Sequence, residues 1–234
     1  TFDIANRNIN QNLTVVSGDL NGNDGTPIVS PTTPNITFIN NGENCYRVVY
    51  CNNLDSNTVL DGFTVSGGLT GGWGNGGGLY IEGGSKIRLT NLTVQDNRSV
   101  DGWGGAMLID GGSSPVITNS VFWRNLGSGG GAIFCNGGNA VFTNCTFADN
   151  VGGNGGAVHT HTNAAVTFRN CIFWGNRVNS NGSQIFNSPG STGTAINCLI
   201  QGGYAGTNIL TTNPLFANAP GGNFRLNTGS PAYD

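Results

Sequence analysis

Short apolar and polar runs return along this chain about every 26 residues. The clearest unit lies in residues 130–150, where a Gly-Gly-Ala triplet opens a run of three short apolar stretches. An asparagine precedes the last stretch, and its counterparts follow one another at intervals of 28, 25, 26 and 27 residues: Asn91, Asn119, Asn144, Asn170 and Asn197. This spacing predicts a repeat of one supersecondary unit.

Two further markers share the period. A Gly-Gly-small triplet opens each unit, at residues 76–78, 104–106, 130–132 and 155–157. A second asparagine follows the first after six residues: Asn97, Asn125, Asn150 and Asn176. Three markers with one period indicate a solenoid, in which each unit forms one coil stacked on the last.

Each coil is expected to contain three short strands, for which the best examples are residues 132–135, 140–143 and 145–147. Asn144 separates the second and third strands, a place that suits a left-handed backbone. Gly62 takes this place in the first regular coil. We therefore predict an all-β, parallel β-helix of about seven to eight coils, with ladders of Asn, Phe and Cys side chains.

Alternation along each strand assigns its inward positions. Two columns of side chains from the third strand are expected to point inward. The first contains Leu92, Ser120, Cys145, Cys171 and Cys198, and the second contains Val94, Phe122, Phe147, Phe173 and Ile200. The second strand is expected to add Leu89, Ile117, Phe142 and Phe168. The glycine-rich loops at residues 69–76, 99–104, 126–129 and 151–154 close the turns, and two of them carry Trp73 and Trp103.

The chain is expected to form one domain over residues 1–234. Residues 1–59 would supply irregular coils and a cap, with strands near 13–16, 36–39 and 46–50. Residues 60–200 hold the regular repeats, and residues 201–234 form a last coil and cap. Caps are expected because a solenoid end exposes strand edges and apolar core.

The low charge of the chain argues against one class of partner. Only 9% of the residues are charged, the net charge is −3, and Lys86 is the only lysine. Without a basic patch, nucleic acid is not a favoured partner. No apolar run is long enough to cross a bilayer.

Six cysteines occur, and none forms the CxxC spacing typical of zinc sites. Cys145, Cys171 and Cys198 are expected to stack as buried thiols that behave as small apolar groups. Cys45 and Cys51 flank a predicted strand, and a disulfide between them is left open.

The pairing of Gly-Gly-Ala-[Ile/Val] with Phe-x-x-Asn resembles the repeat of polymorphic outer-membrane proteins. Here residues 130–133 pair with 147–150, and residues 155–158 with 173–176. The C-terminal residues 213–216 and 229–234 resemble the ending of many secreted bacterial β-helix proteins of the pectin-lyase-like group. The resemblance covers about residues 60–234 and implies a right-handed parallel β-helix that is secreted or at the bacterial cell surface. We expect the chain to be a fragment or the mature part of a longer surface protein.

In related β-helix enzymes the substrate lies on the outer face of the first strand column. On that face this chain would present a row of Tyr80, Leu108, Phe134 and His159 beside a row of Glu82, Asp110, Asn136 and His161. Aromatic rings next to polar groups suit a glycan. The candidate ligand-binding residues are therefore Tyr80, Phe134, Asn136, His159 and His161.

Catalytic and metal-ligating candidates are fewer. Glu82 and Asp110 lie in adjacent coils, which suits the ~5–5.5 Å carboxylate spacing of retaining glycosidases, but any exposed acidic pair on a solenoid shares that spacing. The two histidines of residues 159–161 would need a third ligand to bind a metal ion, which a nearby Asp or Glu could supply, but the pattern favours exposed histidines. A turn similar to a calcium loop offers Asp19, Asn21, Asn23 and Asp24, with one residue too many before its glycine.

Three functions are consistent with this pattern. The first hypothesis is a non-enzymatic surface module, an adhesin or stalk, that binds a glycan or a surface protein of a host or neighbouring cell. The alternative is a carbohydrate-active enzyme, either a polysaccharide lyase or a glycoside hydrolase, that uses the same face. The third is a structural module that associates with itself in a larger surface assembly. The sequence indicates no cofactor other than calcium.

Overall fold

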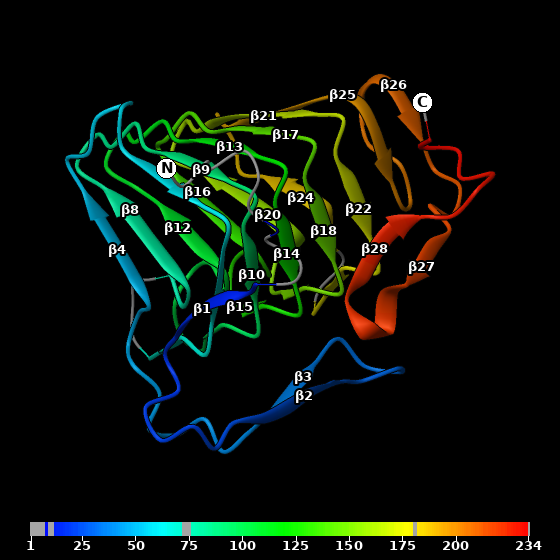
Figure 1. The fold of residues 1–234 in the computed structure, drawn as a ribbon. Helices are drawn as coiled ribbons and strands as arrows, with labels where there is room; N and C mark the ends of the chain where they lie inside the picture. The colour runs from blue at the N-terminus through cyan, green and yellow to red at the C-terminus, as the bar shows by residue number, and fades with distance from the viewer. Residues whose placement is uncertain (1–7, 9–11, 72–75, 180–181, 234) are drawn as a thin grey trace.

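The chain winds into a parallel β-solenoid in the computed structural model, which describes residues 8, 12–71, 76–179 and 182–233. In Figure 1 the strands of successive coils run side by side from the blue end to the orange end of the molecule. No described residue belongs to a helix with the length and apolarity that a membrane crossing requires.

The strands form columns along the solenoid axis. The first column contains β4 (Val49–Asn52), β8 (Leu79–Glu82), β12 (Met107–Ile109), β16 (Ile133–Asn136), β20 (Gly155–His161) and β24 (Ser183–Asn187). The second contains β5 (Val59–Asp61), β9 (Arg88–Thr90), β13 (Val116–Thr118), β17 (Val141–Thr143) and β21 (Ala165–Arg169). The third contains β1 (Thr14–Ser17), β6 (Phe63–Ser66), β10 (Thr93–Gln95), β14 (Val121–Trp123), β18 (Thr146–Ala148) and β22 (Ile172–Trp174). The long strand β25 (Thr192–Ile200) joins the second and third columns into one sheet, and β26 (Gly206–Leu210) pairs with it.

Two details of the coils differ from the sequence prediction. The described residues form about five complete coils rather than seven to eight, because both ends of the chain leave the winding to form hairpins. Each coil also has a fourth, two-residue segment, and four of these five segments lie in or at the edge of the predicted glycine loops. These segments are β7 (Leu69–Thr70), β11 (Arg98–Ser99), β15 (Leu126–Gly127), β19 (Val151–Gly152) and β23 (Arg177–Val178).

The predicted inward columns are confirmed. All of their members are buried, since each is at most 1% exposed. The strands β14, β18 and β22 pair in parallel without a shift, so Phe147 lies between Phe122 and Phe173. Its ring stacks on theirs at centroid distances of 4.9 and 4.5 Å. The like-on-like core therefore follows from the register.

The cysteine ladder is also confirmed. Cys145, Cys171 and Cys198 are buried, and all six cysteines of the chain are free thiols, including Cys45 and Cys51. The Cys145 thiol donates to the carbonyl of Thr143 at 3.4 Å. Ser120 takes the same place one coil earlier and donates to the carbonyl of Thr118 at 2.8 Å, so the serine and the cysteine make the same local bond.

The two asparagine rows have different roles. The first row has the expected left-handed backbone, with φ between 51° and 55° at all five residues. Its exposed side chains bond along the stack, as Asn144 donates to Asn119 at 3.3 Å and Asn170 to Asn144 at 3.2 Å. The second row, not the first, satisfies polar groups in the core. Buried Asn125 donates to Asn150 at 3.0 Å and to the carbonyl of Val94 at 2.9 Å.

The N-terminal strand expected at residues 46–50 begins later, as β4 at Val49. Before it, Cys45 is bonded across the end of the solenoid: its N–H donates to Gly18 at 2.8 Å, and its carbonyl accepts from Leu69 at 3.0 Å. These contacts hold the segment away from the first column until Val49.

Two antiparallel hairpins lie on the outside of the solenoid (Figure 1). The first pairs β2 (Gly25–Val29) with β3 (Ile36–Ile39), and Arg177 holds its tip by donating to the carbonyl of Ser30. The second pairs β27 (Phe216–Asn218) with β28 (Asn223–Leu226) around the 3-10 turn η2 (Ala219–Gly221). Phe224 of this hairpin packs on Trp123 at 5.6 Å.

Replacing Phe147 by alanine tests the stacked core. Phe147 is fully buried, so Phe147→Ala is expected to leave a cavity and to lower the free energy of unfolding by about 3–5 kcal/mol. Urea titration measures the change. Val116→Ala is the control, because Val116 is 40% exposed and its loss is expected to cost less than about 1 kcal/mol. Equal effects of the two substitutions would contradict an interior column.

Candidate functional site

The outer face of the first column brings the predicted residues together in two rows. Register places Tyr50, Tyr80, Leu108, Phe134, His159 and Phe186 in one row across the six strands. The second row contains Asn52, Glu82, Asp110, Asn136 and His161, where Asp110 directly follows β12. The predicted neighbours are therefore neighbours in the structure.

Half of the aromatic row is covered, and there the expectation of an open groove is wrong. Phe134 is only 1% exposed and His159 only 3%. The ring of Trp103, from the loop at residues 99–104, stacks on Phe134 at 4.7 Å. A side-chain carbon on Gly129, in the next loop, would lie 2.5 Å from the Phe134 ring, so the absence of one lets that loop close down as well. The corresponding loop with Trp73 lies outside the described residues.

His159 is enclosed at the other end of the covered row. Its ring contacts Phe134 at 4.7 Å and Phe186 at 5.0 Å, and its Nε2 lies 2.9 Å from the hydroxyl of Ser188. Burial, and then the nearby His161, lower the pKa of His159 to about 4. The imidazole is therefore neutral near pH 7. His159 is buried under the covered part of the row and is not exposed to a ligand.

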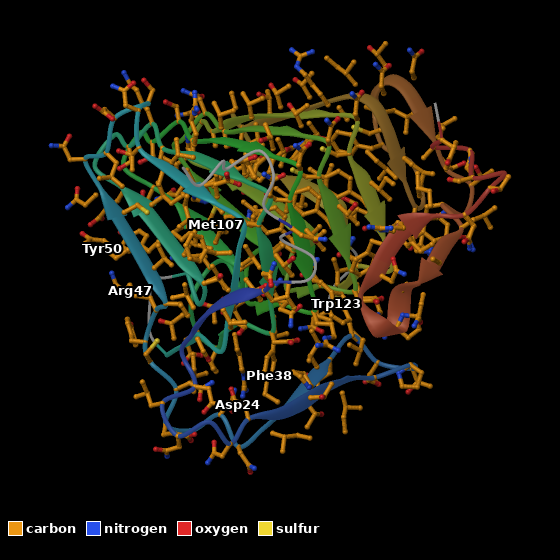
Figure 2. All side chains as sticks on the ribbon, in the orientation of Figure 1. Asp24, Phe38, Arg47, Tyr50, Met107 and Trp123 are labelled. Atoms are coloured by element: carbon orange, nitrogen blue, oxygen red, sulfur yellow. The ribbon has the colours of Figure 1, made fainter. Side chains whose placement is uncertain are left out.

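The uncovered end of the face is built around Glu82. Tyr80 donates its hydroxyl to Glu82 Oε2 at 2.6 Å, and Tyr50 donates to the other carboxylate oxygen. The two tyrosine rings lie 5.7 Å apart. The Arg47 guanidinium lies 5.3 Å from the Tyr50 ring centre and 5.1 Å from that of Tyr80. Figure 2 shows Arg47 and Tyr50 on the outer side of β4, at the end of the solenoid.

A line of hydrogen bonds continues along the polar row. Asn136 donates to Asp110 Oδ1 at 3.0 Å, and the same oxygen accepts from the N–H of Gly111 at 2.7 Å. His161 Nδ1 lies 3.4 Å from Asn136 Oδ1. His161 is exposed, while Asp110 and Asn136 are half-buried. The open strip therefore presents two tyrosines, two carboxylates, an amide and an imidazole.

The direction of the pKa shift of Glu82 decides whether this residue is suited to act as a general acid. Hydrogen bonds from Tyr50 and then Tyr80 hold the pKa of Glu82 below its ordinary value. In turn, burial and the bond to Glu82 raise the pKa of Tyr80, so this phenol stays protonated. A general acid of a glycosidase needs a raised pKa to be protonated at its working pH. Glu82 has the opposite shift and is unsuited to that role.

The calcium candidates are only partly brought together. Carboxylate oxygens of Asp19, Asp24 and Glu43 lie within 4.8 Å of one another, and Glu43 was not among the predicted residues. Asn21 and Asn23 are exposed on the same turn. The Asp19 carboxylate already accepts the N–H groups of Gly22, Asn23 and Asp24 at 2.8 to 3.2 Å, and these bonds hold its pKa low. Three carboxylates suit a calcium ion, which stays a prediction.

Sequence reasoning missed Arg47 and Tyr50. Both belong to the segment before the regular repeats, so the period that identified Tyr80 does not extend to them. The available signal was the alternation from Val48 to Asn52, which resembles the run from Leu79 to Glu82. That alignment places Tyr50 over Tyr80, as the structure does.

A comparison with family models gives one match: a model described as right handed beta helix region covers residues 20–218. Neither the curated proteins nor the solved structures gave a significant match.

The pH dependence of stability tests the buried His159. Its pKa is about 4 in the folded chain and about 6.5 when unfolded, so the unfolded chain binds the extra proton first. Stability is therefore expected to fall as the pH decreases from about 6.5 towards 4. His159→Gln is expected to flatten this decrease, measured as urea unfolding at pH 7, 5.5 and 4.5. The exposed His161→Gln is the control: it removes only the smaller cause of the lowered His159 pKa, so it should reduce the decrease far less than His159→Gln does. Identical curves for wild type and His159→Gln would contradict the assignment.

Proposed function

Because the chain belongs to the right-handed β-helix family, we propose that it is a non-enzymatic module that binds a glycan on the open end of the first column. We propose further that it acts at the bacterial cell surface as an adhesin or a stalk. The observation that carries the glycan proposal is the continuous open strip from Tyr50 to His161. The family itself accommodates several activities, so the site must supply the argument.

The strip has the chemistry that a sugar chain requires. The Tyr50 ring is half exposed and lies beside Tyr80, which offers an apolar surface to the C–H face of a sugar. Glu82, Asp110 and Asn136 offer fixed acceptors and donors for hydroxyl groups one coil apart, about 4.8 Å. Since neighbouring groups already hold these side chains, little conformational entropy is lost on binding.

The same contacts support binding over turnover. Both oxygens of Glu82 accept tyrosine hydroxyls, and one oxygen of Asp110 accepts two donors. A lyase or glycosidase at this face would need one of these carboxylates to exchange protons with the substrate. A carbohydrate-active enzyme is the alternative, and the reducing-sugar assay described next would detect its turnover.

The experiment combines a glycan array with a reducing-sugar assay on every glycan that binds. Tyr50→Ala is expected to weaken binding about tenfold, because it removes the exposed ring. Tyr233→Ala is the matched control, since Tyr233 is 65% exposed and lies near the C-terminus. We expect no release of reducing ends.

Two results would decide against the proposal. Turnover that Glu82→Gln or Asp110→Asn abolishes would establish the enzyme. Binding to no glycan, or binding that Tyr50→Ala and Tyr233→Ala weaken equally, would remove the strip as the site and leave a structural or self-associating module.

A further inference from the structure

A second groove lies on a different side of the solenoid, between the outer asparagine row and the C-terminal segment. Its cavity of about 590 Å³ is within the size range of ligand sites. One wall consists of stacked amides on the solenoid strands up to β26, and the other of side chains from β28 and the residues after β28. The residues that the argument uses are Asn144, Asn170, Asn197, Asn208, Leu210 and Phe224. Figure 1 shows β28 and β27 beside β22, at the orange and red end.

The amide wall is ordered and has hydrogen-bonding capacity to spare. Asn144, Asn170, Asn197 and Asn208 stack on successive strands, so they span about 14 Å at the strand spacing. Asn170 donates to Asn144 at 3.2 Å, and Asn208 donates to Asn197 at 2.9 Å. An amide has two donor hydrogens and two acceptor positions, and each of these exposed side chains uses only part of them among the described residues.

The opposite wall is apolar and fixed. Phe224 packs edge-on against Trp123 at 5.6 Å and against Phe216 at 5.1 Å. Leu210 from β26 is 43% exposed at the same groove. Among the described residues, no Asp, Glu, Lys, Arg or His lines the cavity. The groove thus combines an amide ladder with an apolar wall and carries no charged side chain.

We propose that this groove binds a segment of a neutral polysaccharide, with the sugar hydroxyls on the amide ladder and the apolar ring faces against Phe224 and Leu210. The lack of charge disfavours acidic glycans such as polyuronates, which would lose hydration without gaining a cationic partner. The ladder repeats every 4.7–4.9 Å, whereas an extended peptide advances about 3.3 Å per residue, so a peptide along the ladder falls out of register.

This inference does not depend on the function proposed for the first column. The two sites share no residue, and they differ in charge, because the strip near Glu82 is acidic and the groove is neutral. A protein with both would hold one chain at two places or two chains at once.

The test measures binding of cellohexaose, laminarihexaose, mannohexaose and xylohexaose by calorimetry. The measurements use the intact chain with the substitutions Tyr50→Ala and Tyr80→Ala, which remove binding at the first site. At least one neutral hexasaccharide is expected to bind. Asn170→Gly and Asn197→Gly keep the left-handed backbone, at φ 52° and 53°, while they remove an amide. Each is expected to weaken binding about five- to tenfold, which corresponds to one lost hydrogen bond.

Asn91→Gly is the matched control, because Asn91 has the same backbone at φ 53° but bonds to Asp61 at the far end of the row. It should bind as well as its parent. Phe224→Leu keeps an apolar anchor on Trp123 and should weaken binding if the ring contacts the sugar. Thermal unfolding of every variant checks that it is folded.

Three outcomes would overturn the inference. In the first, no neutral hexasaccharide binds in the Tyr50→Ala, Tyr80→Ala background, although the unsubstituted chain binds one; this result leaves the first-column proposal intact. In the second, Asn91→Gly weakens binding as much as Asn170→Gly. In the third, hexagalacturonate or an uncharged Asn- and Thr-rich peptide binds more tightly than every neutral saccharide and depends on the same asparagines.

Discussion

The structure depends on unshifted parallel pairing between neighbouring coils. Because strand Val121–Trp123 pairs residue for residue with Thr146–Ala148, each side chain lies on its counterpart from the previous coil. Phenylalanines can then stack nearly parallel, with interplanar angles of 9° and 4° around Phe147. The same register lets a polar residue be buried, since an asparagine in the interior finds another asparagine above and below it.

The interior asparagine row supplies the polar half of this arrangement. Asn125 is fully buried, yet its amide group bonds to two backbone carbonyls and to Asn150, and its oxygen accepts from Asn97. It thereby bonds to inward carbonyls of two neighbouring strands, at Val94 and Trp123. A single missing member would leave its neighbours unsatisfied, so the row favours coils of similar length.

The two candidate sites lie where irregular segments leave the surface of the regular coils accessible. The glycine loop with Trp103 folds over Phe134, so the first column stays accessible near Tyr50 and along its polar row from Glu82 to His161. At the opposite end, the C-terminal hairpin lies against Trp123 and forms the wall of the neutral groove. Arg124 stabilises that surface, because it pairs with Asp96 at 2.7 Å and lies 3.6 Å from the Trp123 ring centre. Both candidate sites are therefore formed where irregular segments meet regular coils.

The period of the sequence was enough to predict the repeat, the strand columns and the inward residues, because a solenoid with constant register converts spacing along the chain directly into stacking. It also placed Glu82 beside Asp110 and Asn136 beside His161. Only the tertiary structure decided which rows stay open. Burial of Phe134 and His159 depends on loops and on Ser188, whose contacts have no period, and the hairpins fold back over the solenoid through contacts such as Phe224 with Trp123. Such contacts join segments far apart in sequence, so no local pattern records them.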